Sequence, residues 1–246
     1  MIVVVGLAFE ARIAAGPGVR VICSGDGRNL EGALQRAIAG GHSGLISFGV
    51  AGGLAPHLRP GTCIVGSAVV SGNDRFPTDS DWSEKLLEAM PGAVHGPLLG
   101  ASRPIKTVKD KRALHHETGA VAVDMESHVV ARVAADHGLP MAAIRVIVDS
   151  AGYSLPEAAV VAMRPDGTTD FMALLGGLAR RPREIALLLR IALHAQVARA
   201  SLRRGRQLLG PNLNVLRPSS PLGMPSLEPA VGPLDAAPPV LGSSFG

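Results

Sequence analysis

Short apolar segments alternate with helix-like segments along most of the chain, and this alternation constrains the fold more than any other feature. Apolar runs of strand length occupy residues 2–5, 19–24, 44–48, 62–70, 121–123 and 141–148. Segments with helical spacing or helix-end residues lie between them, at 29–39, 82–90, 109–118 and 127–137. Strands that are apolar throughout are typical of parallel sheets covered by helices on both faces. The pattern therefore predicts an α/β fold with a mostly parallel sheet.

The composition agrees with a core made of small aliphatic side chains. Of the 246 residues, 47% are hydrophobic and only 3% aromatic, which favours a helix-covered sheet over an aromatic-rich sandwich. Cys23 and Cys63 both lie in apolar segments, so we expect buried reduced thiols and not a disulfide or a metal pair. No Cys/His spacing is typical of a zinc site, and the pair His115-His116 is expected on a charged, solvated surface. We therefore expect no metal.

The amino-terminal segment and the charge distribution exclude several classes of protein. Residues 1–6 are apolar but short and lack a basic leader, which predicts a strand and not a signal peptide. No segment reaches the roughly 18 apolar residues of a membrane span, so a cytoplasmic protein is expected. The net charge is +4, but residues 180–217 carry nine arginines and one acid, for a net +8. The remaining chain is therefore at −4, and no nucleic-acid binding is expected.

The pattern changes after Asp149. Two short helices are predicted at 155–163 and 171–178, around a turn at 164–167. Pro182 then begins a long basic helical pattern that extends to about Leu209. Residues 211–246 are rich in Pro, Gly and Ser without periodicity, which predicts a disordered tail. The predicted organisation is a main domain at 1–180, a basic amphipathic helix at 181–210 and a tail at 211–246.

Two glycine-rich segments follow predicted strands. The segment Gly49-Val50-Ala51-Gly52-Gly53 is predicted to be a turn whose N–H groups can approach a ligand. A purely structural turn explains it equally well, and no helix of the right kind follows to make it a dinucleotide-binding fingerprint. The segment from Ser24 to Asn29 is interpreted as a tight turn with Asn29 near a helix cap.

Three acidic residues lie beside apolar segments, where a carboxylate is costly unless something binds it. Glu126, within Val123-Asp124-Met125-Glu126-Ser127, precedes a helix; Asp149 ends the last predicted strand; Glu10 follows the first strand, with Arg12 close by. Each has a structural alternative: a helix-start acid for Glu126, a helix N-cap for Asp149, and a surface ion pair for Glu10 and Arg12. The carboxyl ends of parallel strands are also where open α/β sheets bind ligands, so these acids are candidate site residues.

Five segments, taken in order, resemble the purine nucleoside phosphorylase and methylthioadenosine nucleosidase superfamily. They are Val5-Gly6, Ser24-Gly25-Asp26-Gly27, Gly49-Val50-Ala51-Gly52-Gly53-Leu54, Val123-Asp124-Met125-Glu126-Ser127 and Arg145-Val146-Ile147-Val148-Asp149. The resemblance covers about residues 1–151. It implies a three-layer nucleoside phosphorylase-type α/β fold, with a central mixed, mostly parallel sheet flanked by helices.

Three segments are further similar to the hopanoid-associated (adenosylhopane) phosphorylases. They are Gly6-Leu7-Ala8-Phe9-Glu10-Ala11-Arg12-Ile13-Ala14, Ser47-Phe48-Gly49-Val50-Ala51-Gly52-Gly53-Leu54 and Arg164-Pro165-Asp166-Gly167. This similarity implies phosphorolysis of adenosylhopane, with release of adenine and a phosphoribosyl hopanoid. Inorganic phosphate would be a co-substrate, and no cofactor is implied.

The superfamily resemblance also implies roles for individual residues. Met125 would pack under the ribose, and Glu126 would accept hydrogen bonds from its hydroxyls, a charge-assisted contact. Asp149 would protonate N7 of adenine, which requires a pKa raised by its apolar surroundings. The wall for base and ribose would come from Val50, Ala51 and Gly52.

The expected anion site departs from the family pattern. Phosphorylases of the superfamily usually carry Arg at the position of Ser47 and Ser or Thr at that of Val50, so phosphate would depend on Gly6, Arg12 and Ser47. Arg12 is the best anion ligand available because a guanidinium can bind phosphate bidentately. Nucleosidases instead carry a Glu after the first strand to orient water, and Glu10 lies within one residue of that position. Phosphorolysis is favoured by Arg12, and hydrolysis of methylthioadenosine or S-adenosylhomocysteine stays open as the alternative.

The resemblance and the basic helix also bear on partners. The expected ligand is a small nucleoside, with a lipid-linked one as the finer hypothesis, and the family implies a homo-oligomer. The basic helix at 182–209 is expected either to pack on the core or at an oligomer contact, or to draw the protein to anionic lipid on the inner face of the membrane. A different class stays open, a catalytically silent nucleoside-binding or membrane-scaffolding protein.

Overall fold

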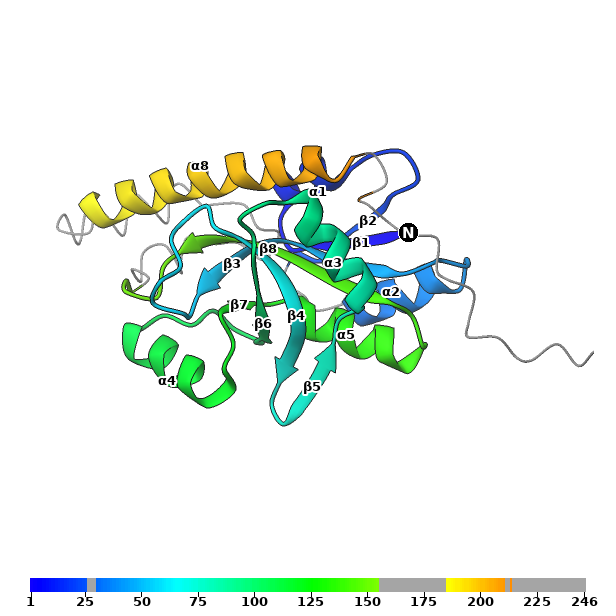
Figure 1. Ribbon diagram of the computed structural model, residues 1–246, viewed down its shortest axis with the longest axis horizontal. Coiled ribbons are helices and arrows are strands. Elements are labelled where there is room, and N and C mark those ends of the chain that lie inside the picture. Colours follow the sequence, from blue (N-terminus) through cyan, green and yellow to red (C-terminus); the bar gives the residue numbers. More distant parts are fainter. Residues whose placement is uncertain (26–29, 155–184, 211–212, 214–246) are drawn as a thin grey trace, which may run out of the picture.

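One mixed sheet forms the centre of the molecule (Figure 1). The computed structural model describes residues 1–25, 30–154, 185–210 and 213. The strands are β1 (Ile2–Val5), β2 (Arg20–Cys23), β3 (Leu45–Gly53), β4 (Cys63–Ser71), β5 (Asp74–Pro77), β6 (Val94–Gly100), β7 (Ala122–Asp124) and β8 (Met141–Asp149). The α/β class and the mixed, mostly parallel sheet are thus confirmed.

The strand order makes part of the sheet close on itself. The order is β2-β1-β3-β7-β6-β4-β5, and β8 pairs with both β3 and β4. Strands β3, β7, β6, β4 and β8 therefore form a ring, from which β1, β2 and β5 extend. The parallel pairing of β3 with β8 runs from Leu45–Met141 to a register shift at Gly52, which lies opposite Asp149. The parallel pairing places the carboxyl ends of β3 and β8 side by side.

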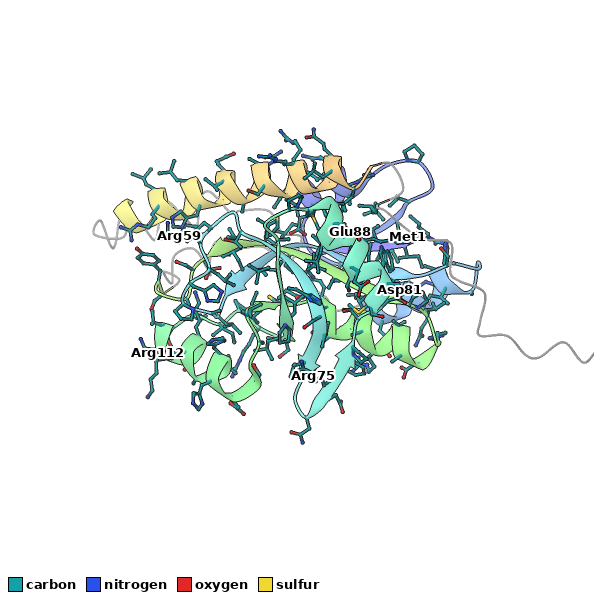
Figure 2. All side chains as sticks on the ribbon, in the orientation of Figure 1. Met1, Arg59, Arg75, Asp81, Glu88 and Arg112 are labelled. Atoms are coloured by element: carbon teal, nitrogen blue, oxygen red, sulfur yellow. The ribbon has the colours of Figure 1, made fainter. Side chains whose placement is uncertain are left out.

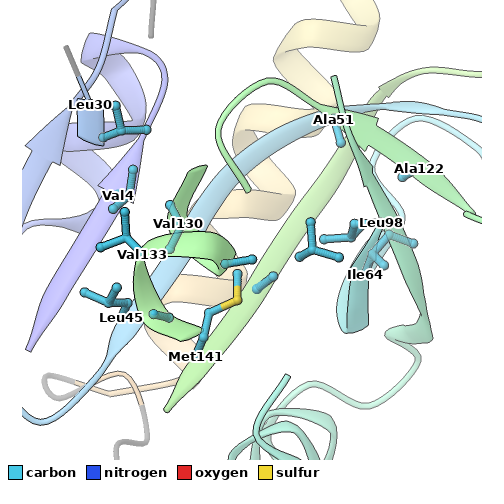
Figure 3. Close-up of a cluster of buried hydrophobic side chains, with 14 of the residues drawn as sticks. Val4, Leu30, Leu45, Ala51, Ile64, Leu98, Ala122, Val130, Val133 and Met141 are labelled. Atoms are coloured by element: carbon cyan, nitrogen blue, oxygen red, sulfur yellow. The ribbon is translucent and has the colours of Figure 1, made fainter. Parts of the chain in front are cut away.

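Helices cover the sheet on both faces. They are α1 (Ala8–Ala14), α2 (Leu30–Ile38), α3 (Ser80–Ala89), α4 (Val108–Thr118), α5 (Ser127–Asp136) and α8 (Ile185–Leu208). One core cluster packs α2 and α5 on the sheet, through residues such as Leu30 and Val130 (Figure 3). A second cluster, which includes Trp82 and Leu202, packs α1, α3 and α8 on the other face. The aliphatic core expected from the composition is therefore divided into two layers by the sheet.

The long helix α8 lies along one side of the molecule, over the sheet and next to α1 (Figure 1). Ala198 and Leu202 are buried against the second core cluster, whereas Leu189 and Leu193 are 61% and 66% exposed. The core-packed alternative for this helix is thus confirmed for its carboxy-terminal half. Across the residues that the structure describes, no helix has the length and apolarity needed to cross a bilayer.

Several local predictions were wrong. The segment Gly49–Gly53 is not a turn, because β3 continues through it to Gly53. Strands β5 and β6 were not predicted. The thiols are free, as expected, but Cys23 is exposed and Cys63 only half-buried. Predictions for 155–163, 164–167, 171–178, most of the tail at 211–246 and part of the turn at 24–29 lie outside the described residues.

Candidate active site

Glu10 is a buried carboxylate held by backbone groups from two elements. It lies at the third position of α1, which follows β1 after a two-residue connection, and there its carboxylate accepts from the N–H of the N-cap residue Leu7. Its Oε2 accepts hydrogen bonds from the N–H groups of Gly6 (2.9 Å) and Leu7 (2.8 Å), and its Oε1 accepts one from Val50 on β3 (2.7 Å). Burial raises the pKa of Glu10, although Arg145 and these N–H groups oppose the rise. The carboxylate thus joins α1 to the middle of β3.

Arg145 is the fully buried cation of the site. It points from β8, and its Nη2 donates to the Ser47 hydroxyl (2.6 Å), to Asp124 Oδ1 (3.0 Å) and to the Ser127 hydroxyl (3.1 Å). Asp124 Oδ1 also accepts from the N–H groups of Glu126 and Ser127, which fixes the start of α5. Burial raises the pKa of Asp124, but Arg145 and these hydrogen bonds outweigh it, so the carboxyl titrates below its ordinary value.

Glu126 approaches the same guanidinium from the amino end of α5. Its Oε2 lies 3.6 Å from Arg145 Nη2, and a Cβ built on Gly6 would lie 2.5 Å from its Oε1. The pKa of Glu126 is raised to about 7, because burial and the nearby carboxylates of Asp124 and Glu10, which raise it, outweigh Arg145, which lowers it. Near neutral pH this group therefore exchanges a proton easily.

Gly49 leaves the space in which Glu10 and Arg145 converge. A Cβ built on Gly49 would lie 2.5 Å from Glu10 Oε1 and 2.9 Å from Arg145 Nη1. Within the described part of the chain, Arg145 Nη1 and Nε are buried without a hydrogen-bond partner. A buried donor without a partner is costly, so a ligand or water that accepts from Arg145 Nη1 would be stabilised here.

Asp149 is the last residue of β8 and lies opposite Gly52 of β3. A Cβ built on Gly52 would lie 3.2 Å from Asp149 Oδ1. Its Oδ2 forms an ion pair with Lys111 of α4, whose side chain is fully buried. Burial raises the pKa of Asp149, while Lys111 and His194 lower it. The expected direction of this shift is therefore confirmed.

The two groups of acids are separated by a short stretch of one strand. Glu10 and Arg145 converge at Gly49, and Asp149 lies at Gly52, three residues along β3. At the rise of a β-strand this corresponds to roughly 10 Å. A carboxylate that holds a sugar at one end and an acid that meets a base at the other can therefore act on one ligand of nucleoside size.

The other predicted site residues are Met125, Ala51, Gly6, Ser47 and Arg12. Met125 is exposed beside Glu126, and Ala51 is buried between Val50 and Gly52 on β3. The N–H of Gly6 and the hydroxyl of Ser47 are already engaged, by Glu10 and by Arg145. Arg12 is exposed on α1. The structure therefore brings together the acids but does not gather the three expected phosphate ligands.

Two functional candidates were missed in the sequence. Arg145 was noted only as part of a motif, although an Arg inside an otherwise apolar strand requires a buried acidic partner. Lys111 was assigned to a charged helix with a solvated surface, and no local signal distinguishes it from its exposed neighbours. Arg112, the next residue, lies on the outer side of α4 (Figure 2).

The chain is similar to two known nucleosidases over part of its length. The 5′-methylthioadenosine/S-adenosylhomocysteine nucleosidases of Mycobacterium bovis and Mycobacterium tuberculosis are 29% identical over 97 residues, which is 39% of this chain. The match spans only 33% of the length of these relatives.

Solved structures extend the similarity to the whole fold. The Helicobacter pylori 5′-methylthioadenosine/S-adenosylhomocysteine nucleosidase, solved with butyl-thio-DADMe-Immucillin-A, superposes with a TM-score of 0.57 at 16% identity, covering 84% of this chain and 97% of that one. The Streptococcus pneumoniae nucleosidase, solved with the inhibitor MT-ImmA, gives 0.55 at 18% identity, covering 82% and 97%. A family profile described as the phosphorylase superfamily matches residues 5–180. The chain therefore belongs to the phosphorylase superfamily.

Proposed function

We propose that this protein hydrolyses the N-glycosidic bond of an adenine nucleoside. The observation that carries the proposal is the position of Glu10, a buried carboxylate held by three backbone N–H groups next to Arg145 Nη1, which has no hydrogen-bond partner among the described residues. This arrangement suits a water molecule that gives a proton to Glu10 and accepts a hydrogen bond from Arg145. The nucleosidases to which the chain is similar support the same reaction type.

The proposed reaction divides the work among three acids. Glu126 accepts hydrogen bonds from the ribose hydroxyls, which stabilises the sugar as it gains oxocarbenium character. Asp149 donates a proton to N7, so that the C1′–N9 bond breaks and adenine leaves neutral. Water attacks C1′, which forms the new C1′–O bond, and the water gives a proton to Glu10. The raised pKa values of Glu10 and Asp149 suit a base and an acid that work near neutral pH.

Engagement of the predicted phosphate ligands favours hydrolysis over phosphorolysis. Phosphate would have to compete with Glu10 for the N–H of Gly6, and the Ser47 hydroxyl, which accepts from Arg145, is fully buried. It would also meet the buried carboxylate of Glu10 and the half-buried carboxylate of Glu126, which repel an anion when they are ionised. Arg12, the residue that favoured phosphorolysis, is exposed. The lipid-linked substrate implied by the hopanoid resemblance stays a prediction.

The experiment that tests the proposal measures adenine release from adenosine, methylthioadenosine and a hydrophobic 5′-alkyl adenosine, each with and without inorganic phosphate. We expect release without phosphate and no acceleration by it. The 5′-alkyl arm tests the lipid-linked hypothesis. Release that requires phosphate would overturn hydrolysis in favour of phosphorolysis, and no release from any nucleoside would favour a catalytically silent protein.

A further inference from the structure

We propose that Lys111 is a positioning residue for Asp149, which fixes the carboxylate at the end of β8 and sets the pH range in which it delivers a proton. The inference rests on the proposed function, in which Asp149 protonates the leaving adenine. No feature of the sequence motifs indicated it, since Lys111 comes from α4, 38 residues before its partner.

The ammonium of Lys111 is fully committed to this end of the strand. Besides Asp149 Oδ2, it donates to the carbonyl oxygens of Ser150 (3.2 Å) and Tyr153 (2.9 Å). A lysine ammonium has three N–H donors, and all three have an acceptor here. Lys111 therefore has no donor left for a substrate and acts through the geometry of Asp149.

The burial of Lys111 argues against an incidental ion pair. Its side chain is fully buried, whereas that of Asp149 is 13% exposed. Removing a lysine ammonium from water is costly, and a hydrophobic residue of similar size often stabilises a fold as well or better. A buried lysine on this carboxyl is thus better explained by a need to control the carboxyl than by stability. The adjacent Lys109 and Arg112 stay in solvent.

Lys111 opposes the effect of burial on its partner. Burial raises the pKa of Asp149, and two charged groups from different elements lower it: Lys111 of α4, by charge and hydrogen bond, and His194 of α8, by charge. Without Lys111 only His194 would oppose burial. The carboxyl would then stay protonated to a higher pH, because its ionised form would lose its main partner.

The kinetic test is the pH profile of adenine release. If Asp149 is the acid, activity declines as pH rises through its pKa. In Lys111→Met this decline should move to higher pH by about one to three pH units, the usual effect of an adjacent opposite charge. Lys109→Met, an exposed lysine on the same helix, is the control and should leave the decline in place. A merely structural role would lower the whole profile without moving it.

A second measurement gives the same answer without relying on activity. The side-chain carboxyl carbons of ¹³C-labelled aspartates are titrated by NMR, and Asp149→Asn identifies the signal of Asp149. We expect the pKa of Asp149 to rise in Lys111→Met. We expect the same in Lys111→Gln, which keeps polar donors and replaces the methionine variant if that protein does not fold. An unchanged Asp149 titration overturns the inference. A raised titration in a protein that releases no adenine overturns the proposed function and leaves the positioning role standing.

Discussion

At the scale of single residues, the absence of a side chain at Gly49 lets Glu10 and Arg145 approach β3 closely. We predict that Gly49→Ala lowers turnover by about 100-fold, because its methyl group would lie 2.5 Å from Glu10 Oε1 and push that carboxylate off the water. The matched control is Gly40→Ala, where the nearest atom is 3.5 Å away. The adenine-release rates of the two variants are compared. Equal rates would show that turnover does not depend on the absence of a side chain at Gly49.

Arg145 neutralises a group of buried acids, and its loss should be costly. Because Asp124 would be left buried without a cation, Arg145→Met is expected to lower the free energy of unfolding by about 3–5 kcal/mol. Arg132, which pairs with Glu31 at the surface with both side chains 49% exposed, provides the comparison. Arg132→Met should change the free energy of unfolding by less than about 1 kcal/mol. Urea unfolding measures both, and similar losses would contradict the buried role of Arg145.

The raised pKa of Glu126 should make the free energy of unfolding depend on pH. Its pKa rises from 4.5 to about 7 on folding, so the folded state binds more protons than the unfolded state between these values. Stability from this group is therefore complete below about pH 4.5 and declines as pH rises through 7. Wild type should thus lose more unfolding free energy than Glu126→Gln between pH 5 and pH 7.5. A difference between the two proteins that stays constant with pH would contradict the shift.

The sequence identified the acids but not the cations that control them. Glu10, Glu126 and Asp149 could be recognised because each interrupts or ends an apolar segment. Arg145 and Lys111 depend on tertiary contacts: one meets acids from β7 and α5, and the other meets the end of β8. Helix spacing alone cannot show that Lys111 faces inward while Lys109 and Arg112 face outward.

At the scale of elements, most strands and helices could be predicted, and the failures have local causes. Strand β6 contains Gly96-Pro97, which normally breaks a strand, but Pro97 falls where the register between β4 and β6 shifts, so its missing N–H is tolerated. The glycines of β3 suggested a turn, yet they lie in a strand where Gly49 and Gly52 admit side chains from elsewhere.

Substitutions at the exposed Leu189 and Leu193 of α8 test whether this helix binds lipid better than deletion of the helix does. Deleting residues 180–246 would also remove Ala198 and Leu202 from the core. The double variant Leu189→Gln/Leu193→Gln changes only exposed positions and should leave unfolding unaffected. If α8 binds lipid, it should weaken co-sedimentation with anionic vesicles, since that attraction needs apolar area as well as arginines. Unchanged co-sedimentation would exclude this face as a membrane contact.

At the scale of the whole molecule, the closed ring of strands explains why distant segments meet. Because β8 pairs with both β3 and β4, the carboxyl end of β8 is held beside β3, where Lys111 of α4 contacts Asp149. Glu10 then ties α1 to β3, and Glu126 reaches the same site from α5. The site thus depends on the assembled sheet and on no single motif, and the homo-oligomer implied by the family stays a prediction.

The most direct test of the account is adenine release by Glu10→Gln in phosphate-free buffer, with nucleoside binding measured on the same protein by calorimetry. We expect binding to be retained while release falls by about 100- to 10,000-fold, the usual contribution of a general base. Release at the wild-type rate by Glu10→Gln would contradict the claim that Glu10 activates water.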